Sequence, residues 1–122
     1  MCIRDKKLLV TRSKGEKMFF ALGGKIKPGE TELECLQREV MEEIGCEPIN
    51  PKHLETFEGR NHDNTKTIKM TCYTCELKGT ILPCSEIEET AWIDKRYKEK
   101  GIQVASILEL YIIPYLIEKR LL

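Results

Sequence analysis

Three glutamates that follow a glycine-rich segment have the spacing of a cation site. Glu39, Glu42 and Glu43 would share one arc of a helix, because residues three and four apart lie on the same face. On a bare helix each like-charge pair costs roughly a few tenths of a kcal/mol. A hard divalent cation would turn this repulsion into coordination, since Mg²⁺ binds carboxylate oxygens, water and substrate phosphates together. The pattern therefore predicts a metal-dependent site for a pyrophosphate.

The residues around these glutamates have the start and stop signals of the helix that must carry them. Thr31 and Glu34 form the pattern of a capping box, which predicts a helix that begins just after Thr31. Gly45 suits the left-handed residue that ends a helix. Four apolar residues recur at spacings of three and four and predict the stripe that packs on a core: Leu33, Leu36, Val40 and Ile44.

The loop and helix together resemble a known motif. Gly24, Glu30 and the run from Arg38 to Cys46 match the Nudix box, Gly-x5-Glu-x7-Arg-Glu-U-x-Glu-Glu-x-Gly-U, where U is a bulky apolar residue. Every fixed position is met, and Cys46 supplies a small apolar side chain at the last one. The resemblance implies an α/β fold, a Nudix-like α/β/α sandwich. In it a mixed sheet lies between the catalytic loop and helix and a C-terminal helix.

The resemblance also implies an activity. Hydrolysis of a pyrophosphate needs cations that neutralise the phosphates, a deprotonated water and in-line geometry. Glu39, Glu42 and Glu43 would hold Mg²⁺ or Mn²⁺, and the resemblance adds the carbonyl oxygen of Gly23 as a further metal ligand. The implied function is metal-dependent hydrolysis of the pyrophosphate bond in a nucleoside diphosphate linked to another moiety.

The identity of the base that activates water stays open. Crowded carboxylates raise one another's proton affinity, so either a member of the cluster or a carboxylate on a nearby loop is a candidate. We favour Glu86, ahead of the strand that carries Trp92, as the further acid, with a solvated loop glutamate as the alternative. Arg38 would orient Glu42 or another carboxylate of the motif and would not touch the substrate.

Two other functional classes compete with this interpretation. A nucleotide-sensing module could keep the fold without cleaving its ligand, but a pure sensor has no chemical reason to retain the complete carboxylate set. A redox or zinc module built on Cys72 and Cys75 conflicts with their spacing, because residues three apart on a strand point to opposite faces. No second cysteine or histidine pair completes a tetrahedral site.

Length and charge agree with one small enzyme domain that covers residues 1–122. The chain is 41% hydrophobic, and its 20 basic and 20 acidic residues cancel, which gives no general field for nucleic acid or a membrane. We therefore expect a small-molecule nucleotide or nucleotide-sugar as partner, with the protein as a monomer or homodimer. The charged start of the chain is unlike a secretory leader, which predicts a cytoplasmic location.

The rest of the chain predicts strands around one further helix. The expected strands are Lys7–Arg12, Lys17–Leu22, His53–Gly59, Thr67–Leu77 and Glu89–Ile93, and the closing helix is Ser106–Leu121, interrupted by Pro114. A polar hairpin loop, Arg60–Lys66, contains His62 as a solvated turn residue. Four cations could meet phosphate oxygens, although surface solvation is the more ordinary role of each: Arg12, Lys25, Lys27 and Arg60.

Overall fold

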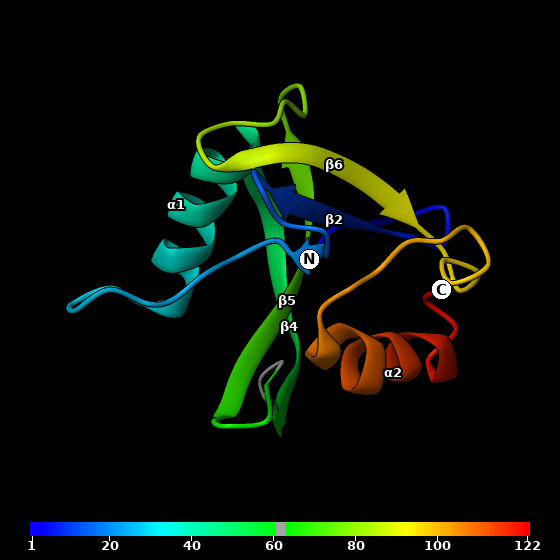
Figure 1. Cartoon of the computed structure of the whole chain (residues 1–122). Coiled ribbons are helices and arrows are strands. Elements are labelled where there is room, and N and C mark those ends of the chain that lie inside the picture. The colour runs from blue at the N-terminus through cyan, green and yellow to red at the C-terminus, as the bar shows by residue number, and fades with distance from the viewer. Residues whose placement is uncertain (61–62) are drawn as a thin grey trace.

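The computed structural model describes residues 1–60 and 63–122 as two connected sheets with a helix on either side (Figure 1). The strands are β1 (Ile3–Arg4), β2 (Lys7–Ser13), β3 (Phe20–Ala21), β4 (Glu47–Arg60), β5 (Thr67–Lys78) and β6 (Ile87–Ile93). Helix α1 spans Glu32–Ile44, and the C-terminal helix consists of the π-helical turn η1 (Leu108–Ile112) followed by α2 (Ile113–Glu118). This is the layered α/β arrangement that the sequence predicts.

Strand β2 is the centre of the molecule. It pairs antiparallel with β1, β3 and β6 in a four-stranded sheet. Its apolar residues alternate between two cores, because successive side chains on a strand point to opposite faces. Leu8 and Val10 pack with the C-terminal helix, whereas Leu9 packs with α1. All three are fully buried, so each contributes about 1.5–3 kcal/mol of hydrophobic stabilisation.

The second sheet is the long β4–β5 hairpin, which is joined to the first by Met1. The Met1 amino group donates to the Tyr73 carbonyl at 2.6 Å, and the Cys75 amide donates to the Met1 carbonyl at 3.0 Å. When one residue bonds to two residues that lie two positions apart on the neighbouring strand, the two strands are paired in parallel. The sheet system is therefore mixed, as predicted. The prediction of a strand over His53–Gly59 was too short, because β4 continues through two irregular pairings to Glu47.

Helix α1 has the predicted ends. The Thr31 hydroxyl accepts from the Glu34 amide at 3.1 Å, and the Glu34 carboxylate accepts from the Thr31 amide at 3.0 Å. Gly45 adopts the left-handed conformation, with φ of 67°, that ends the helix. The predicted stripe was wrong at Leu33, which is 48% exposed, while the rest of the stripe is buried. Leu33 lies in the first turn of α1, where the buried face is formed instead by Cys35 and Leu36.

The C-terminal helix is interrupted as predicted, by a wider turn. The Ile113 amide bonds to the Leu108 carbonyl five residues earlier, and Pro114 follows immediately. Because proline has no amide hydrogen, a π-turn at this point accommodates a break in the α-helical pattern. One side of the helix faces solvent and the other faces the core: Leu110 is 63% exposed, whereas Leu108 is fully buried.

The strand before the glycine loop is shorter than predicted. The strand expected over Lys17–Leu22 is reduced to Phe20–Ala21, because the Phe19 backbone turns away to bond Gln103 and Ala105 at 2.9 Å each. In the predicted hairpin loop, His62 lies outside the described residues. Among the described residues, none of the helices is long and apolar enough to cross a membrane.

Candidate active site

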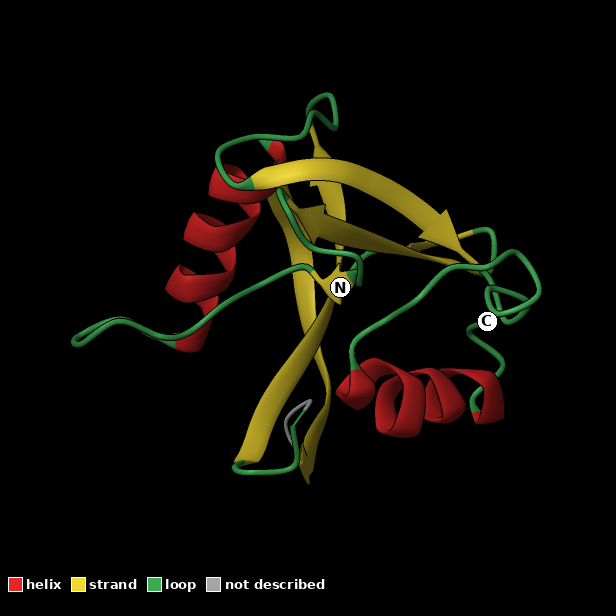
Figure 2. Ribbon diagram, in the orientation of Figure 1, coloured by secondary structure: helices red, strands yellow, loops and turns green. Residues whose placement is uncertain are grey.

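A cleft of about 1040 Å³ lies between α1, the sheets and the C-terminal helix. The loop that leads into α1 leaves β3 and runs outward before it returns to the helix (Figure 2). Gly23 and Gly24 of this loop line the cleft together with Glu43 of α1. The cleft therefore has the loop and helix of the sequence motif as one of its walls.

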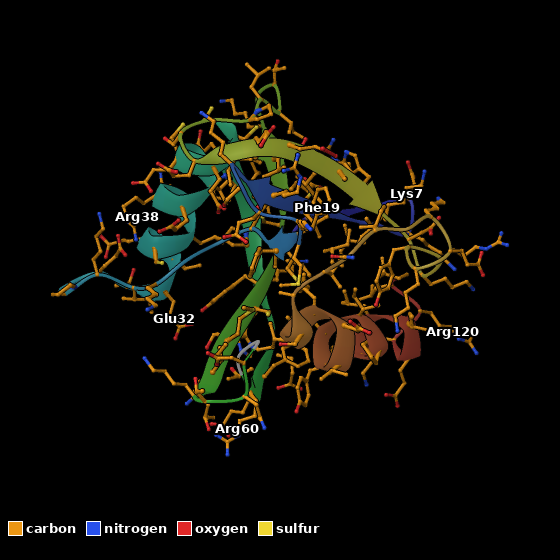
Figure 3. All side chains as sticks on the ribbon, viewed as in Figure 1. Lys7, Phe19, Glu32, Arg38, Arg60 and Arg120 are labelled. Atoms are coloured by element: carbon orange, nitrogen blue, oxygen red, sulfur yellow. The ribbon has the colours of Figure 1, made fainter. Side chains whose placement is uncertain are left out.

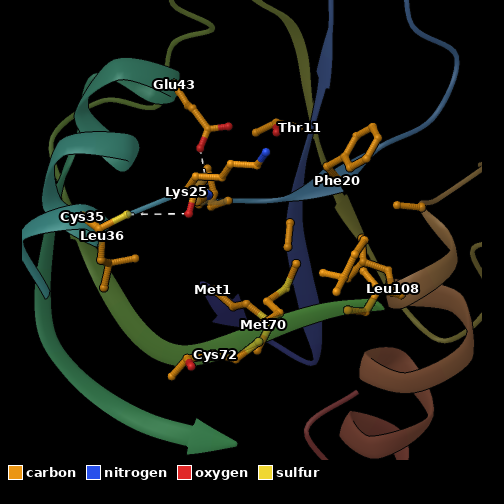
Figure 4. A pocket seen from close by; sticks show the side chains of 18 of the residues that line it. Met1, Thr11, Phe20, Lys25, Cys35, Leu36, Glu43, Met70, Cys72 and Leu108 are labelled. Atoms are coloured by element: carbon orange, nitrogen blue, oxygen red, sulfur yellow. Dashed lines mark hydrogen bonds between the residues drawn. The ribbon is translucent and has the colours of Figure 1, made fainter. Parts of the chain in front are cut away.

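Glu43 is the glutamate of the motif that reaches into this cleft. Its carboxylate accepts from the Gly23 amide at 2.8 Å, and the Thr11 hydroxyl lies close enough to lower the pKa of Glu43 slightly. Burial raises the pKa of Glu43 to about 7, and the negative charges of Glu39 and Glu42 add to the increase, while the Gly23 hydrogen bond opposes it. In Figure 4, Glu43 points from α1 toward Thr11 and the loop. Without a cation, this carboxylate is therefore half protonated near neutral pH.

Arg38 holds the loop and the helix together. Its guanidinium donates to both carboxylate oxygens of Glu30, at 2.7 and 3.0 Å, and to Glu39 at 2.7 Å. It also donates to the Lys25 carbonyl at 3.1 Å and lies 3.4 Å from Glu42. The paired charge lowers the pKa of Glu30 to about 2, and Glu30 in turn raises the pKa of Arg38. This fork of bonds sets the position of the loop relative to α1.

Glu39 and Glu42 occupy different positions around Arg38. The Glu39 carboxylate packs against Gly24, where an added Cβ would lie 2.5 Å from its carboxyl carbon. Gly24 therefore must lack a side chain for Glu39 to keep its place. Glu42 is 50% exposed, and neither it nor Glu39 lines the cleft itself. The structure thus brings Glu39 and Glu43 to the glycine loop and leaves Glu42 at the rim.

The other predicted site residues are divided between the cleft and the surface. Glu86 and Lys25 line the cleft. Arg12 instead pairs with Glu88 and Glu89 on β6, at 3.4 and 3.1 Å. Arg60 lies at the tip of the β4–β5 hairpin, far from Arg38 beside α1 (Figure 3).

Lys27 and Trp92 also lie away from the cleft. Lys27 is exposed and is absent from the cleft lining. Trp92 packs against the core under α1, and the Arg4 guanidinium lies 5.5 Å from its ring centroid. Of the predicted phosphate contacts, Lys25 is therefore the cation that the structure leaves at the cleft.

The donor atoms at the glycine loop fit a hard cation that keeps part of its water shell. Among the described residues, no group of three His, Cys, Asp or Glu side chains converges into a ready-made metal cage. Mg²⁺ seldom uses such a cage and is usually bound by one or two carboxylates, water and substrate phosphates. Glu43 and Glu39 flank the two glycines with oxygen donors, and Gly24 leaves the space that Glu39 fills. This donor set suits Mg²⁺ or Mn²⁺.

Several residues of the cleft were missed by the sequence analysis. Thr11 is 2% exposed on β2, and it contacts Glu43 although it lies far away in the sequence. Two further cations, Lys14 and Lys69, line the cleft, as do Phe20 and Met70. A strand pattern alone identifies which residues share a face, but not which face meets a cleft. No local signal in the sequence could therefore have identified these residues.

The motif, the fold and the site can be compared with known proteins. A model of the NUDIX domain family matches residues 1–96. The NAD-capped RNA hydrolase NudC of Chromobacterium violaceum is 32% identical to the chain over 94 residues, which cover 75% of this chain and 34% of that protein. The chain therefore spans about a third of the length of this relative.

Solved structures share the fold. The E. coli ORF135 protein has a TM-score of 0.75 and 19% identity, and the match covers 98% of this chain and 86% of that one. A Nudix hydrolase family member from Chromobacterium violaceum has a TM-score of 0.73 and 22% identity, covering 98% and 74%. At these identities the likeness establishes the fold alone, which is an α/β fold of the Nudix type.

Proposed function

The chain belongs to the Nudix hydrolase family, and from this premise we propose that it hydrolyses the pyrophosphate bond of a nucleoside diphosphate linked to another moiety, with the help of a divalent metal. One observation carries the proposal. Glu43 is held in a cleft by the Gly23 amide, near Thr11 and beside a glycine loop that lines the same cleft. A carboxylate placed there meets the phosphates of any substrate that enters the cleft.

The metal in this proposal is Mg²⁺ or Mn²⁺. Glu39, Glu42 and Glu43 would hold it, together with the carbonyl oxygen of Gly23. When bound, the cation neutralises phosphate charge and lowers the pKa of water. Because ionised carboxylates are needed, its binding would also keep Glu43 deprotonated at neutral pH, where the metal-free side chain holds a proton about half of the time.

The protein's own residues supply orientation and proton transfer. Glu86 lines the same cleft as Glu43, so we propose that it provides the second carboxylate toward the attacking water. Lys25, with Lys14 and Lys69, faces the cleft as a cation suited to phosphate oxygens. The substrate is thus expected to lie with its phosphates between the glycine loop and these lysines.

Arg38 is a positioning residue in this scheme. It contacts Glu30, Glu39 and the loop carbonyl of Lys25, and it does not line the cleft. Its bonds hold the carboxylate of Glu39 and the loop in one arrangement before substrate arrives. Such preorganisation lowers the barrier because charged groups need not be rearranged in the transition state.

The experiment is a substrate panel. Sugar nucleotides, nucleoside triphosphates, dinucleoside polyphosphates and nucleotide cofactors would be assayed for release of phosphate or nucleoside monophosphate with Mg²⁺ and with Mn²⁺. We expect turnover of at least one compound, its loss in excess chelator and its return when metal is added back. Undiminished turnover in chelator would disprove the metal role. Tight binding without any turnover would instead favour a nucleotide-sensing module.

A further inference from the structure

The cleft has a second end whose chemistry differs from that of the glycine loop. We call it the apolar end and define it by six side chains from β3 and the residues before it, β5 and the C-terminal helix: Met18, Phe20, Ile68, Met70, Ile107 and Leu108. In Figure 4, Met70 and Leu108 lie on the side of the cleft away from Glu43. A substrate held by its phosphates at the loop would therefore place its remaining part among apolar side chains.

The exposed aromatic ring of Phe20 is the most distinctive member of the apolar end. Its neighbour Phe19 is buried in the core, so strand alternation turns Phe20 to the opposite face, where it is 42% exposed. Phe20 also pairs directly with Thr11 across β2 and β3, which places the two side chains on one face of the sheet. Directly paired residues have Cβ atoms about 4.5–5.5 Å apart. Because Thr11 lies near Glu43 in the same cleft, the ring lies one strand away from the residue that faces this carboxylate.

The cleft around the ring is rich in methionine. Three of the four methionines in the chain line the cleft, namely Met1, Met18 and Met70. Methionine has an unbranched, polarizable side chain with three rotatable bonds, so it adapts its shape to different ligands and favours contact with aromatic rings. Protein surfaces that accept many partners are often rich in this residue.

The six side chains of the apolar end offer no strong hydrogen-bond donor or acceptor to the edge of a base. The described lining of the whole cleft includes lysines, glutamates and Tyr73, but no asparagine, glutamine or histidine. The hydroxyl groups of Ser13 and Thr71 both donate and accept, so each can meet either kind of base edge. An apolar surface discriminates weakly between bases, because an unsuitable base leaves no buried polar group unpaired.

These observations lead to one inference, which rests on the proposed function and specifies its substrate. We propose that the apolar end binds the nucleobase by stacking on Phe20 and by contact with Met70, so that the enzyme accepts nucleotides whatever their base. Specificity then comes from the pyrophosphate at the loop and from the aromatic plane of the base. Edge hydrogen bonds contribute little.

The test measures binding and turnover separately. The dissociation constants of ADP, GDP, CDP and UDP, which differ only in the base, would be determined with Mg²⁺ present. We expect the four to agree within about a hundredfold, the range of discrimination available to an apolar pocket. A wider spread, or no binding of any of the four, would overturn the inference. Turnover of the matching glucose-linked nucleotides reports on the proposed function: base-tolerant binding without turnover would refute that function and leave the inference standing.

Variants of Phe20 show whether the ring is responsible. Phe20→Ala should weaken binding of all four nucleotides by about 5- to 100-fold, as expected for the loss of one base–aromatic stack. Phe20→Trp should retain binding, and Phe20→Leu should lose it although the side chain stays apolar. Leu110→Ala removes another exposed apolar side chain, at 63% exposure on the C-terminal helix, and should change nothing. In turnover assays Phe20→Ala should raise KM and leave kcat within a few-fold, because the base lies away from the reacting bond. Unchanged binding in Phe20→Ala would overturn the role of the ring.

Discussion

The two ends of the cleft are built in different ways. At the end that holds Glu43 and the glycine loop, which we call the charged end, Arg38 lies behind the cleft wall and joins Glu30, Glu39 and the Lys25 carbonyl through bonds of 2.7–3.1 Å, all within one continuous loop and helix. At the apolar end, Phe20, Met70 and Leu108 come from separate parts of the chain and meet only in the folded molecule.

This difference separates two requirements of a hydrolase. Stabilising a phosphoryl transition state needs charged groups in fixed positions, which dense local hydrogen bonding provides. Accepting varied substrates needs an adaptable surface, which methionine and an exposed ring provide. If the chemistry is confined to the charged end, substitutions there should lower hydrolysis far more than substitutions elsewhere.

Glu43→Gln should reduce hydrolysis the most, by at least about a hundredfold. The amide keeps an oxygen that can accept from the Gly23 amide, but it lacks the charge that a divalent cation requires. Steady-state rates with Mg²⁺ would be compared with those of Glu47→Gln, an exposed glutamate just beyond α1. A rate equal to that of the parent would show that the carboxylate in the cleft is not a metal ligand.

Gly24→Ala should separate catalysis from stability. The new Cβ would lie 2.5 Å from the Glu39 carboxyl carbon, so this flexible side chain must move away while the backbone stays in place. We expect a loss of activity of about 10- to 100-fold, typical of a misplaced catalytic group, with little change in the melting temperature. Combination with Glu39→Asp, which shortens the displaced side chain, tests the cause. A large drop in melting temperature would mean that Gly24 serves the fold instead.

The metal-free protein should lose stability as pH rises through 7. The folded-state pKa of Glu43 is about 7, above its ordinary value of 4.5, so the folded protein retains a proton that the unfolded chain releases. The corresponding stability is fully present below pH 4.5 and is lost as pH rises through 7. Its size is about 1–3 kcal/mol, from 1.36 kcal/mol per pKa unit.

The control for this pH dependence is Glu43→Gln, which cannot titrate. In chelator at pH 8 it should unfold with a free energy about 1–3 kcal/mol higher than that of the parent, and at pH 5 the gap should narrow. Chemical unfolding at both pH values provides the measurement. If the difference in unfolding free energy between the two proteins does not change with pH, the titrating group is not Glu43.

Replacing Cys72 and Cys75 together by alanine should have the smallest effect on chemistry. Both are buried on β5, and burial raises the pKa of Cys72 to about 11, so its thiol is not a ready metal ligand or nucleophile at neutral pH. We expect hydrolysis within a few-fold of the parent and an unchanged metal requirement. Zinc bound stoichiometrically to the parent, and lost together with activity in the variant, would contradict this expectation.

Much of the charged end could be predicted from the sequence because its interactions are local. The capping box at Thr31, the left-handed Gly45 and the spacing of Glu39 and Glu43 each depend on residues a few positions apart. Helical geometry converts such spacings directly into neighbours in space. The error at Leu33 has the same origin, since periodicity assigns a face to every turn but does not say where the sheet beneath the helix ends.

The apolar end and the partners of Glu43 were decided by the tertiary structure alone. Thr11 reaches Glu43 only because β2 lies beneath α1, and Phe20 faces the cleft only because β3 pairs with β2 in that register. A shift of one residue in a strand would send each of these side chains to the opposite face. Register depends on the packing of the whole molecule, so the sequence by itself specified the chemistry of the site, and the fold determined the surface that selects what enters it.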